Sequence, residues 1–290
     1  MDASQSRSWL GPALIIIIAL WVVSTFGSML IPAMATPALS LRAPLILLMI
    51  FAFLHGAGQY GIIGSFVFFV IAVITGNVFE NMSIMTGFPF GNYHHNEMLG
   101  PKLFLVPLVV GPAFYGVSYL GWRLAATLLG TDLSAGNALA KFGLPIVASL
   151  VTVAWDICLD PLATTFAKFT TYEQGGGYFG VPLSNYAGWF LTVWVIFQLF
   201  ALVWRPSWIG RRADSPSLLY LPPVFWTLMA LQYPVLWLTG AHFEVHDEAG
   251  TLWRSQDFYE TAVMMSVYGM MSISVTTMFA IASRKARGVN

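Results

Sequence analysis

The sequence predicts an all-α integral membrane protein, a polytopic helical bundle with about eight transmembrane helices. Three observations predict this class: 57% of the 290 residues are hydrophobic, only 9% are charged, and long apolar runs recur along the chain. Soluble proteins carry about 25% charged residues, so this chain has too few charges to cover a surface that faces water. The composition therefore excludes a soluble enzyme, a nucleic-acid-binding protein with a basic face and a disordered chain.

The apolar runs set the expected spans, because a bilayer core about 30 Å thick needs roughly 20 helical residues. Only the weakly polar segment His55–Gln59 separates the second run from the third, so seven spans is the fallback count. We expect the first run to be an anchor helix rather than a cleaved signal peptide. One transmembrane domain is expected over residues 1–290. The expected spans are Leu10–Ile31, Pro44–Leu54, Tyr60–Phe79, Leu103–Leu129, Phe142–Leu159, Tyr186–Trp204, Leu218–Gly240 and Thr261–Ala282.

The positions of basic residues predict the orientation in the cell (inner) membrane. Arginine and lysine favour cytoplasmic segments, and they gather after the sixth span (205–212) and at the C-terminus (284–287). An even number of spans then places both termini in the cytoplasm. Arg123, in the fourth span, is expected to extend its side chain to the interface.

Three acidic residues lie inside or at the end of apolar spans, where charge is costly. Glu80 closes the third span, and Asp156 and Asp160 lie at the end of the fifth. Residues four apart share one face of a helix, so the two aspartates can face one cavity. The third and fifth spans run in the same direction, which places all three carboxyl groups towards the outer leaflet. Asp160 before Pro161 also fits an N-cap followed by proline at the start of a helix.

Carboxyl groups in apolar surroundings favour the protonated form, and a close pair cannot both ionise cheaply. Such a group can act as a general acid. Protonation of an unactivated carbon–carbon double bond requires this kind of donor, shielded from water and facing an apolar substrate. We therefore expect Asp156, Asp160 and Glu80 to be catalytic.

Two loops rich in aromatic residues, glycine and proline are expected to line the substrate site. The segment 85–102 is predicted to be re-entrant or to cap a cavity, because irregular backbone at membrane depth must face protein or water. The segment 175–189 has the same composition. Their aromatic faces can stabilise a carbocation, although an interfacial aromatic belt is the alternative for any single ring. The expected substrate-binding residues are Phe88, Phe90, Tyr93, His94, His95, Trp155, Tyr178, Asn185 and Trp189.

The sequence does not favour a metal site or a disulfide. His94, His95 and Glu97 lie close in sequence, but adjacent histidines point apart and no HExxH pattern is present. A proton relay or a hydrogen-bonding role is the preferred interpretation of these histidines. The only cysteine, Cys158, is expected to be a small buried apolar residue. We expect no cofactor.

Four motifs resemble the integral-membrane carotenoid hydratases, a family of carotenoid biosynthesis proteins that includes bisanhydrobacterioruberin hydratase. They lie between about Glu80 and Trp189, and outside this core only the hydrophobic pattern agrees. The family pattern has a second aromatic residue, usually tyrosine, two positions after Tyr93, where this chain has His95. The motifs are Thr86-Gly-Phe-Pro-Phe-Gly-x-Tyr93, Leu99-Gly-Pro-Lys-Leu-x-x-Val-Pro107, Trp155-Asp-x-x-Leu-Asp-Pro161 and Gly177-Tyr-x-Gly-Val-Pro-x-x-Asn185-x-x-Gly-Trp189.

The resemblance implies that water adds across the terminal double bond of a long isoprenoid or carotenoid and gives a tertiary alcohol without a cofactor. Asp156 is then the general acid, Asp160 its charge-coupled partner, and Glu80 orients or deprotonates the water. Asn185 and Tyr93 are implied to be polar groups that support these carboxyls. The expected partners are the lipophilic substrate and membrane lipids.

Two other functions remain open at this point. A membrane terpene cyclase would use the same cation chemistry, either by protonation or by ionising an allylic diphosphate with Mg²⁺ held by Asp156 and Asp160. Lys102 would then contact a phosphate group. The other alternative is a transporter or a carotenoid-binding protein, although no internal repeat of the kind common in transporters is visible.

Overall fold

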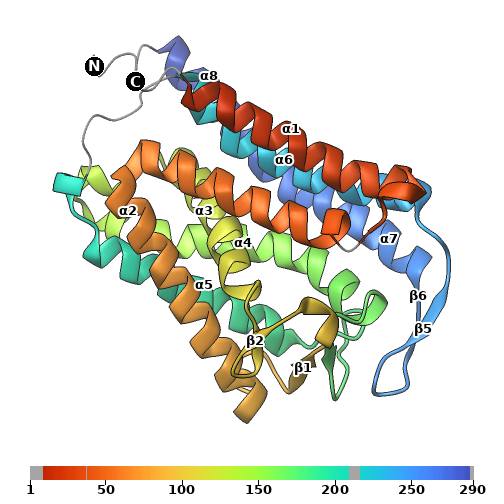
Figure 1. Ribbon diagram of the computed structural model, residues 1–290. Helices are drawn as coiled ribbons and strands as arrows, with labels where there is room; N and C mark the ends of the chain where they lie inside the picture. The colour runs from red at the N-terminus through yellow and green to blue at the C-terminus, as the bar shows by residue number, and fades with distance from the viewer. Residues whose placement is uncertain (1–8, 37, 209–215, 288–290) are drawn as a thin grey trace.

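The computed structural model describes residues 9–36, 38–208 and 216–287, and the chain forms a bundle of packed helices (Figure 1). π-helical turns precede and follow α4 and join α7 to α8, so several helices continue beyond their α-helical bounds. The α-helices are α1 (Leu10–Leu30), α2 (Ala43–Thr86), α3 (Val110–Leu129), α4 (Leu144–Pro161), α5 (Leu183–Val203), α6 (Pro216–Thr239), α7 (Ser255–Met264) and α8 (Ser272–Ala286).

The structure confirms a helical polytopic membrane protein, but it does not confirm the count of eight spans. Among the described residues, six helical stretches are long and apolar enough to cross a membrane. The second and third expected spans are joined in one of the six, and α3 is not among them. The six stretches are Leu10–Leu30, Leu39–Thr86, Leu139–Phe166, Leu183–Val203, Leu218–Thr239 and Ser255–Ala286.

The expected break between the second and third spans is a bend within α2, not a loop. Gly61 adopts φ 78° and ψ 161°, a conformation open to glycine and unfavourable for other residues. The Ser65 hydroxyl crosses the bend and donates to the Phe53 carbonyl at 2.9 Å. The weakly polar residues before the bend stay inside the bundle, because His55 bonds Tyr119 (2.5 Å) and the Leu218 carbonyl (3.0 Å).

Helix α3 lies at the centre of the bundle, where every residue from Phe114 to Ala126 is buried. It packs against α2 and α4. Small residues allow this close approach: a Cβ atom at Gly121 would lie 2.2 Å from Thr152 Oγ1 of α4. A helix buried on all sides needs no lipid-facing surface, which explains why α3 is less apolar than the other expected spans.

The expectation that Arg123 extends to the interface is wrong. Its side chain is buried, because α3 is surrounded by other helices. The guanidinium donates to the Tyr60 hydroxyl at 2.7 Å and lies 3.6 Å from the Asp132 carboxylate. These contacts compensate the charge within the protein.

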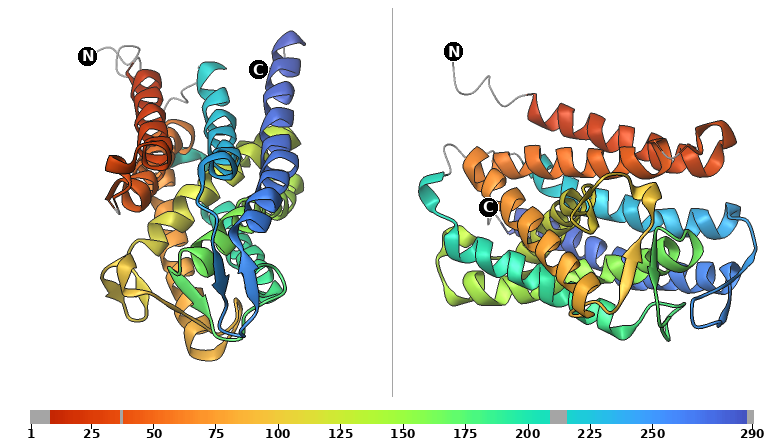
Figure 2. Two further views of the ribbon diagram at one scale, coloured as in Figure 1. Left: turned by 90° about the vertical axis from the view of Figure 1, so that its right-hand side faces the viewer. Right: turned by 60° about the horizontal axis from the view of Figure 1, so that its bottom comes forward.

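Three short antiparallel strand pairs, of which β2–β3 and β5–β6 are hairpins, lie at the end of the bundle opposite the start of α1 and the end of α8 (Figure 2, left). At the end that holds the start of α1, Gly11 of α1 lies beside Leu218 of α6, and Arg284 of α8 donates to the Thr127 carbonyl of α3. The strand pairs are β1 (Tyr93–His95) with β4 (Thr170–Tyr172), β2 (Lys102–Leu103) with β3 (Val106–Pro107), and β5 (Glu244–His246) with β6 (Leu252–Arg254).

The segment 85–102 caps this end of the bundle, as expected. Gly87 ends α2 with φ 79°, and the Ser83 hydroxyl donates to the Gly91 carbonyl and accepts from the Phe90 amide. The chain then enters β1, whose pairing with β4 brings Tyr93 opposite Tyr172. This sheet places the loop directly over Glu80.

Candidate active site

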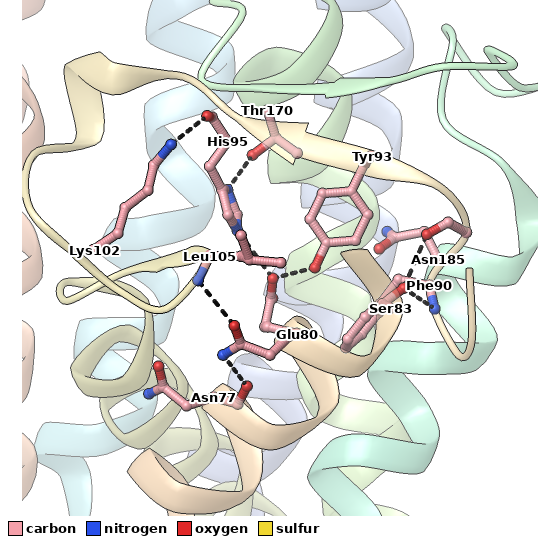
Figure 3. A network of polar contacts seen from close by, with 12 residues as sticks. Asn77, Glu80, Ser83, Phe90, Tyr93, His95, Lys102, Leu105, Thr170 and Asn185 are labelled. Atoms are coloured by element: carbon pink, nitrogen blue, oxygen red, sulfur yellow. Dashed lines mark hydrogen bonds and ion pairs between the residues drawn. The ribbon is translucent and has the colours of Figure 1, made fainter. Parts of the chain in front are cut away.

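Glu80 lies in the last turns of α2, and its buried carboxylate is held by two side chains of β1 (Figure 3). The Tyr93 hydroxyl and His95 Nε2 (3.1 Å) both contact Glu80 Oε2. Alternate side chains of a strand share one face, which is why Tyr93 and His95 point to Glu80 together. His95 Nδ1 lies 3.0 Å from the Thr170 hydroxyl of β4, which fixes the ring.

Asp156 and Asp160 lie in the last turns of α4 and are bridged by one side chain of α5. Asn185 Nδ2 donates to Asp156 Oδ2 at 3.2 Å and to Asp160 Oδ2 at 2.5 Å. The Tyr172 hydroxyl donates to Asn185 Oδ1 at 2.7 Å, so the amide is oriented from the opposite side. Asp156 is fully buried, and within the described residues no ion pair involves either aspartate.

The two tyrosines of the β1–β4 sheet connect Glu80 with the aspartates. Their ring centroids lie 5.4 Å apart. Burial raises the pKa of Tyr172 well above its ordinary value, and the charges of Asp160, Asp156 and Glu80 raise it further. The pKa of Tyr93 is also raised well above its ordinary value, first by burial and then by Glu80. Because all three carboxyl groups act on Tyr172, they lie at the same end of the bundle.

Asp160 lies inside a continuous helix and does not cap a new one. Its backbone carbonyl accepts the Thr164 hydroxyl at 2.7 Å, and the chain passes Pro161 into a π-helical turn over Leu162–Phe166. The N-cap interpretation is therefore wrong. The carboxylate of Asp160 is directed to Asn185 instead, which the one-turn spacing from Asp156 permits.

Part of the expected aromatic lining lies beside the carboxyls. Trp155, adjacent to Asp156, packs edge-on against Trp189 with ring centroids 5.8 Å apart. Trp189 also stacks on Phe114 of α3 at 4.4 Å. Phe90 is buried and lies edge-on to Tyr93 at 6.3 Å. Tyr178 lies edge-on to Tyr186 of α5 at 5.8 Å.

The structure does not bring His94 and Phe88 to this cluster. His94 is exposed because it lies between Tyr93 and His95 on β1 and therefore faces the other side of the strand. Phe88 is also exposed, before the turn that buries Phe90.

Lys102 of this loop contacts a carboxylate and a backbone carbonyl of the same loop. Lys102 Nζ lies 2.7 Å from Glu97 Oε1 and donates to the His95 carbonyl at 3.1 Å. Among the described residues, no group of three or more His, Cys, Asp or Glu side chains is arranged to hold a metal ion. The free Cys158 is buried in α4, as expected.

Three tyrosines of this region were not predicted from the sequence. Tyr172 orients Asn185, and Tyr186 and Tyr233 are electrostatic neighbours of both aspartates. Tyr186 stands beside Asn185 in a motif, but Tyr172 and Tyr233 lie in segments with no recognisable pattern. A tyrosine in an apolar span gives no signal by itself that it faces a site.

The fold and this site define a class: a polytopic helical membrane protein with three converging carboxyl groups and aromatic rings at one end. Residues 41–245 match the family model described as carotenoid biosynthesis protein, so the chain belongs to that family. This match extends on both sides of the core between Glu80 and Trp189 on which the sequence resemblance rests.

The chain is also similar to a bisanhydrobacterioruberin hydratase from Haloarcula japonica. The two are 32% identical over 143 residues, which is 48% of this chain and 46% of the relative. The matched part is therefore less than half of the length of either protein. No solved structure matches the chain.

Proposed function

We propose that this protein is a membrane enzyme of carotenoid biosynthesis that adds water across a terminal double bond of a long isoprenoid or carotenoid. The observation that carries the proposal is Asp156, a fully buried carboxyl that Asn185 links to Asp160 beside Glu80. The family and the name of the hydratase relative support the same chemistry. The product is a tertiary alcohol.

The proposed reaction begins with proton transfer from Asp156 to the less substituted carbon of the double bond. A C–H bond forms, the π bond breaks, and a tertiary cation develops on the neighbouring carbon. The rings of Trp155 and Trp189 stabilise this charge by cation–π attraction, worth about 0.5–2 kcal/mol for each ring. Water adds to the cation and loses a proton, and this proton returns to Asp156 directly or by way of Glu80, so the enzyme ends in the state in which it began.

The other carboxyl groups have distinct proposed roles. Two buried carboxyls that share one amide cannot both ionise cheaply, so Asp160 keeps a proton in the pair. Glu80, already held by Tyr93 and His95, orients the water or takes up its proton. Hydration needs no cofactor in this scheme.

The first test incubates candidate substrates with membranes that contain either the wild type or Asp156→Asn and measures the mass and the amount of the product. Bisanhydrobacterioruberin and a series of isoprenoids of increasing length are the substrates, and hydration adds the mass of one water. We expect Asp156→Asn to lower the rate by about 10²–10⁴-fold, the usual contribution of a general acid. Asp257→Asn, an exposed acid paired with Arg254 at 2.9 Å, is the control and keeps the wild-type rate.

Two results would contradict hydration. A product of unchanged mass indicates cyclisation, and an Asp156→Asn variant with full activity removes the proposed acid. A chelator gives an independent measurement: we expect activity to survive it, whereas loss of activity that Mg²⁺ restores favours ionisation of a diphosphate.

A further inference from the structure

One carboxyl oxygen of Asp156 and three tyrosine hydroxyls in the same part of the bundle are buried without a hydrogen-bond partner among the described residues. They are Asp156 Oδ1 and the hydroxyls of Tyr178, Tyr186 and Tyr233. They come from α4, from the segment before α5, from α5 and from α6. None of them takes part in the hydrogen bonds that join Asn185 and Tyr172 to the two aspartates.

These side chains form one cluster. The rings of Tyr178 and Tyr186 lie edge-on with centroids 5.8 Å apart. Tyr186 interacts electrostatically with Asp156, Asp160 and Tyr178, and Tyr233 with the same three groups. Tyr233 is fully buried between α6 and the rest of the bundle. Two of the phenols, Tyr186 and Tyr233, are therefore neighbours of Asp156, whose Oδ1 is unpaired, and Tyr178 joins them through its ring contact with Tyr186.

Unpaired buried groups of this kind favour the binding of a polar ligand. A buried hydroxyl without a partner destabilises the folded protein, and buried polar groups in native proteins are nearly always paired. A polyene chain has no hydrogen-bonding group to offer. Water, and the hydroxyl of a tertiary alcohol, can both accept from and donate to phenols and a carboxylate.

We propose that Asp156 Oδ1 and the hydroxyls of Tyr178, Tyr186 and Tyr233 bind the water that adds to the carbocation. This inference rests on the proposed hydration and identifies where its second reactant is held. After addition, the same groups hold the tertiary hydroxyl of the product. Tyr186 and Tyr233 thereby become catalytic residues, and Tyr178 completes the site.

In this scheme Asp156 both donates the proton and takes one back, so the protons of the reaction balance. Its Oδ2 accepts the Asn185 N–H, so the acidic hydrogen lies on Oδ1, next to the phenols. Oδ1 gives this hydrogen to the alkene carbon and is left as a carboxylate. When the water oxygen bonds to the cation, the released proton returns to Oδ1. Glu80 is then an orienting charge rather than the base.

The experiment separates protonation from water capture by running the reaction in deuterium oxide. Deuterium in the recovered alkene reports protonation, and the alcohol reports capture by water. We expect Tyr233→Phe and Tyr186→Phe to lower alcohol formation by about 10-fold to 100-fold, because the reacting water loses a hydrogen bond. Deuterium still enters the recovered alkene, since the uncaptured cation loses a proton. Asp156→Asn loses both signals.

Tyr115→Phe is the matched control, a buried tyrosine whose hydroxyl lies 2.9 Å from the Ser65 hydroxyl away from the site. It should keep both signals and lower the melting temperature. Tyr233→Phe should not lower it, because its hydroxyl has no partner among the described residues.

The possible failures are distinct. Wild-type alcohol formation in both Tyr186→Phe and Tyr233→Phe overturns the water site and leaves the hydratase proposal standing. Parallel loss of deuterium and alcohol in these variants also overturns it, because the phenols then serve protonation. A wild-type enzyme that forms no alcohol from any substrate overturns both proposals.

Discussion

At the scale of single residues, Asn185 connects the parts of the candidate site. One amide donates to both aspartates and accepts from Tyr172, so it positions two carboxyl groups that belong to another helix. Its motif indicated a polar supporting group. The contacts themselves were not predictable, because they join α4, α5 and β4, which are separate in the chain.

Replacement of Asn185 by leucine removes this bridge. Each buried group that loses its partner costs about 1–3 kcal/mol, so we expect a lower melting temperature. The displaced carboxyls should lower hydration by about 10-fold to 100-fold. Gln198→Leu is the control, because this amide lies on the same helix and bonds the Lys141 carbonyl far from the site. Equal activity of the two variants would contradict the bridging role.

The buried phenol of Tyr172 predicts a loss of stability at alkaline pH. Its pKa in the folded protein is raised well above the ordinary 10.0, mainly by burial. An unfolded chain ionises this phenol from about pH 10 while the folded protein keeps the proton, so stability falls as the pH rises above 10. Tyrosinate absorbance at pH 10 should be the same for folded wild type and Tyr172→Phe. A difference that appears before unfolding would show that the phenol is accessible.

At the scale of elements, close packing of backbone segments holds the loop before α5. A Cβ atom on Gly176 would lie 2.1 Å from the backbone carbon of Val181, whereas one on Gly177 would meet no atom within 4 Å. The two adjacent glycines therefore differ in what they tolerate. Only the folded loop reveals this difference, because the sequence shows three equivalent glycines in a row.

The pair Gly176→Ala and Gly177→Ala tests this packing. We expect Gly176→Ala to destabilise the protein by about 1–3 kcal/mol, as overpacking usually does, and to lower hydration by displacing Tyr178. Gly177→Ala should match the wild type in thermal unfolding and in product yield. Similar unfolding curves for both variants would mean that the loop rearranges freely.

Element boundaries were the weaker part of the sequence analysis. The apolar pattern located the helices, but it placed a weakly polar break at His55–Gln59, where α2 continues to a bend at Gly61, and it began α3 at Leu103 rather than Val110. Residues between these two starts form β2 and β3 instead. An apolar run favours burial or lipid contact equally, so it does not distinguish a helix from a short hairpin.

At the scale of the whole molecule, the sequence predicts an orientation in the membrane. The basic residues favour a cytoplasmic position for both termini, which puts the carboxyl cluster towards the outer leaflet. Of the residues used for this prediction, Arg211 and Arg212 lie outside the described residues. The strand pairs lie at the end of the bundle opposite the start of α1 and the end of α8 (Figure 2), so labelling one residue at each end tests the orientation.

The single buried cysteine makes the chain suitable for labelling with a membrane-impermeant maleimide. We expect Thr251→Cys, in the turn between β5 and β6, to react from outside intact cells. Lys285→Cys, near the end of α8, should react only after the membrane is opened. Wild type, in which Cys158 is buried, is the unlabelled control. The opposite labelling pattern would reverse the proposed orientation.

The sequence by itself determined that most of the protein lies in lipid, that it is helical and which family it resembles. It also determined which acidic residues are out of place in lipid. Composition and short spacings carry this information, because the two aspartates one turn apart and the alternating side chains of β1 depend only on local geometry. Only the tertiary structure decided that Glu80 lies near Asp156 and Asp160, that Arg123 is buried, and that Tyr172 and Tyr233 join the cluster. In a membrane, lipid-facing and buried side chains are equally apolar, so the sequence pattern does not tell which face of a helix turns inward.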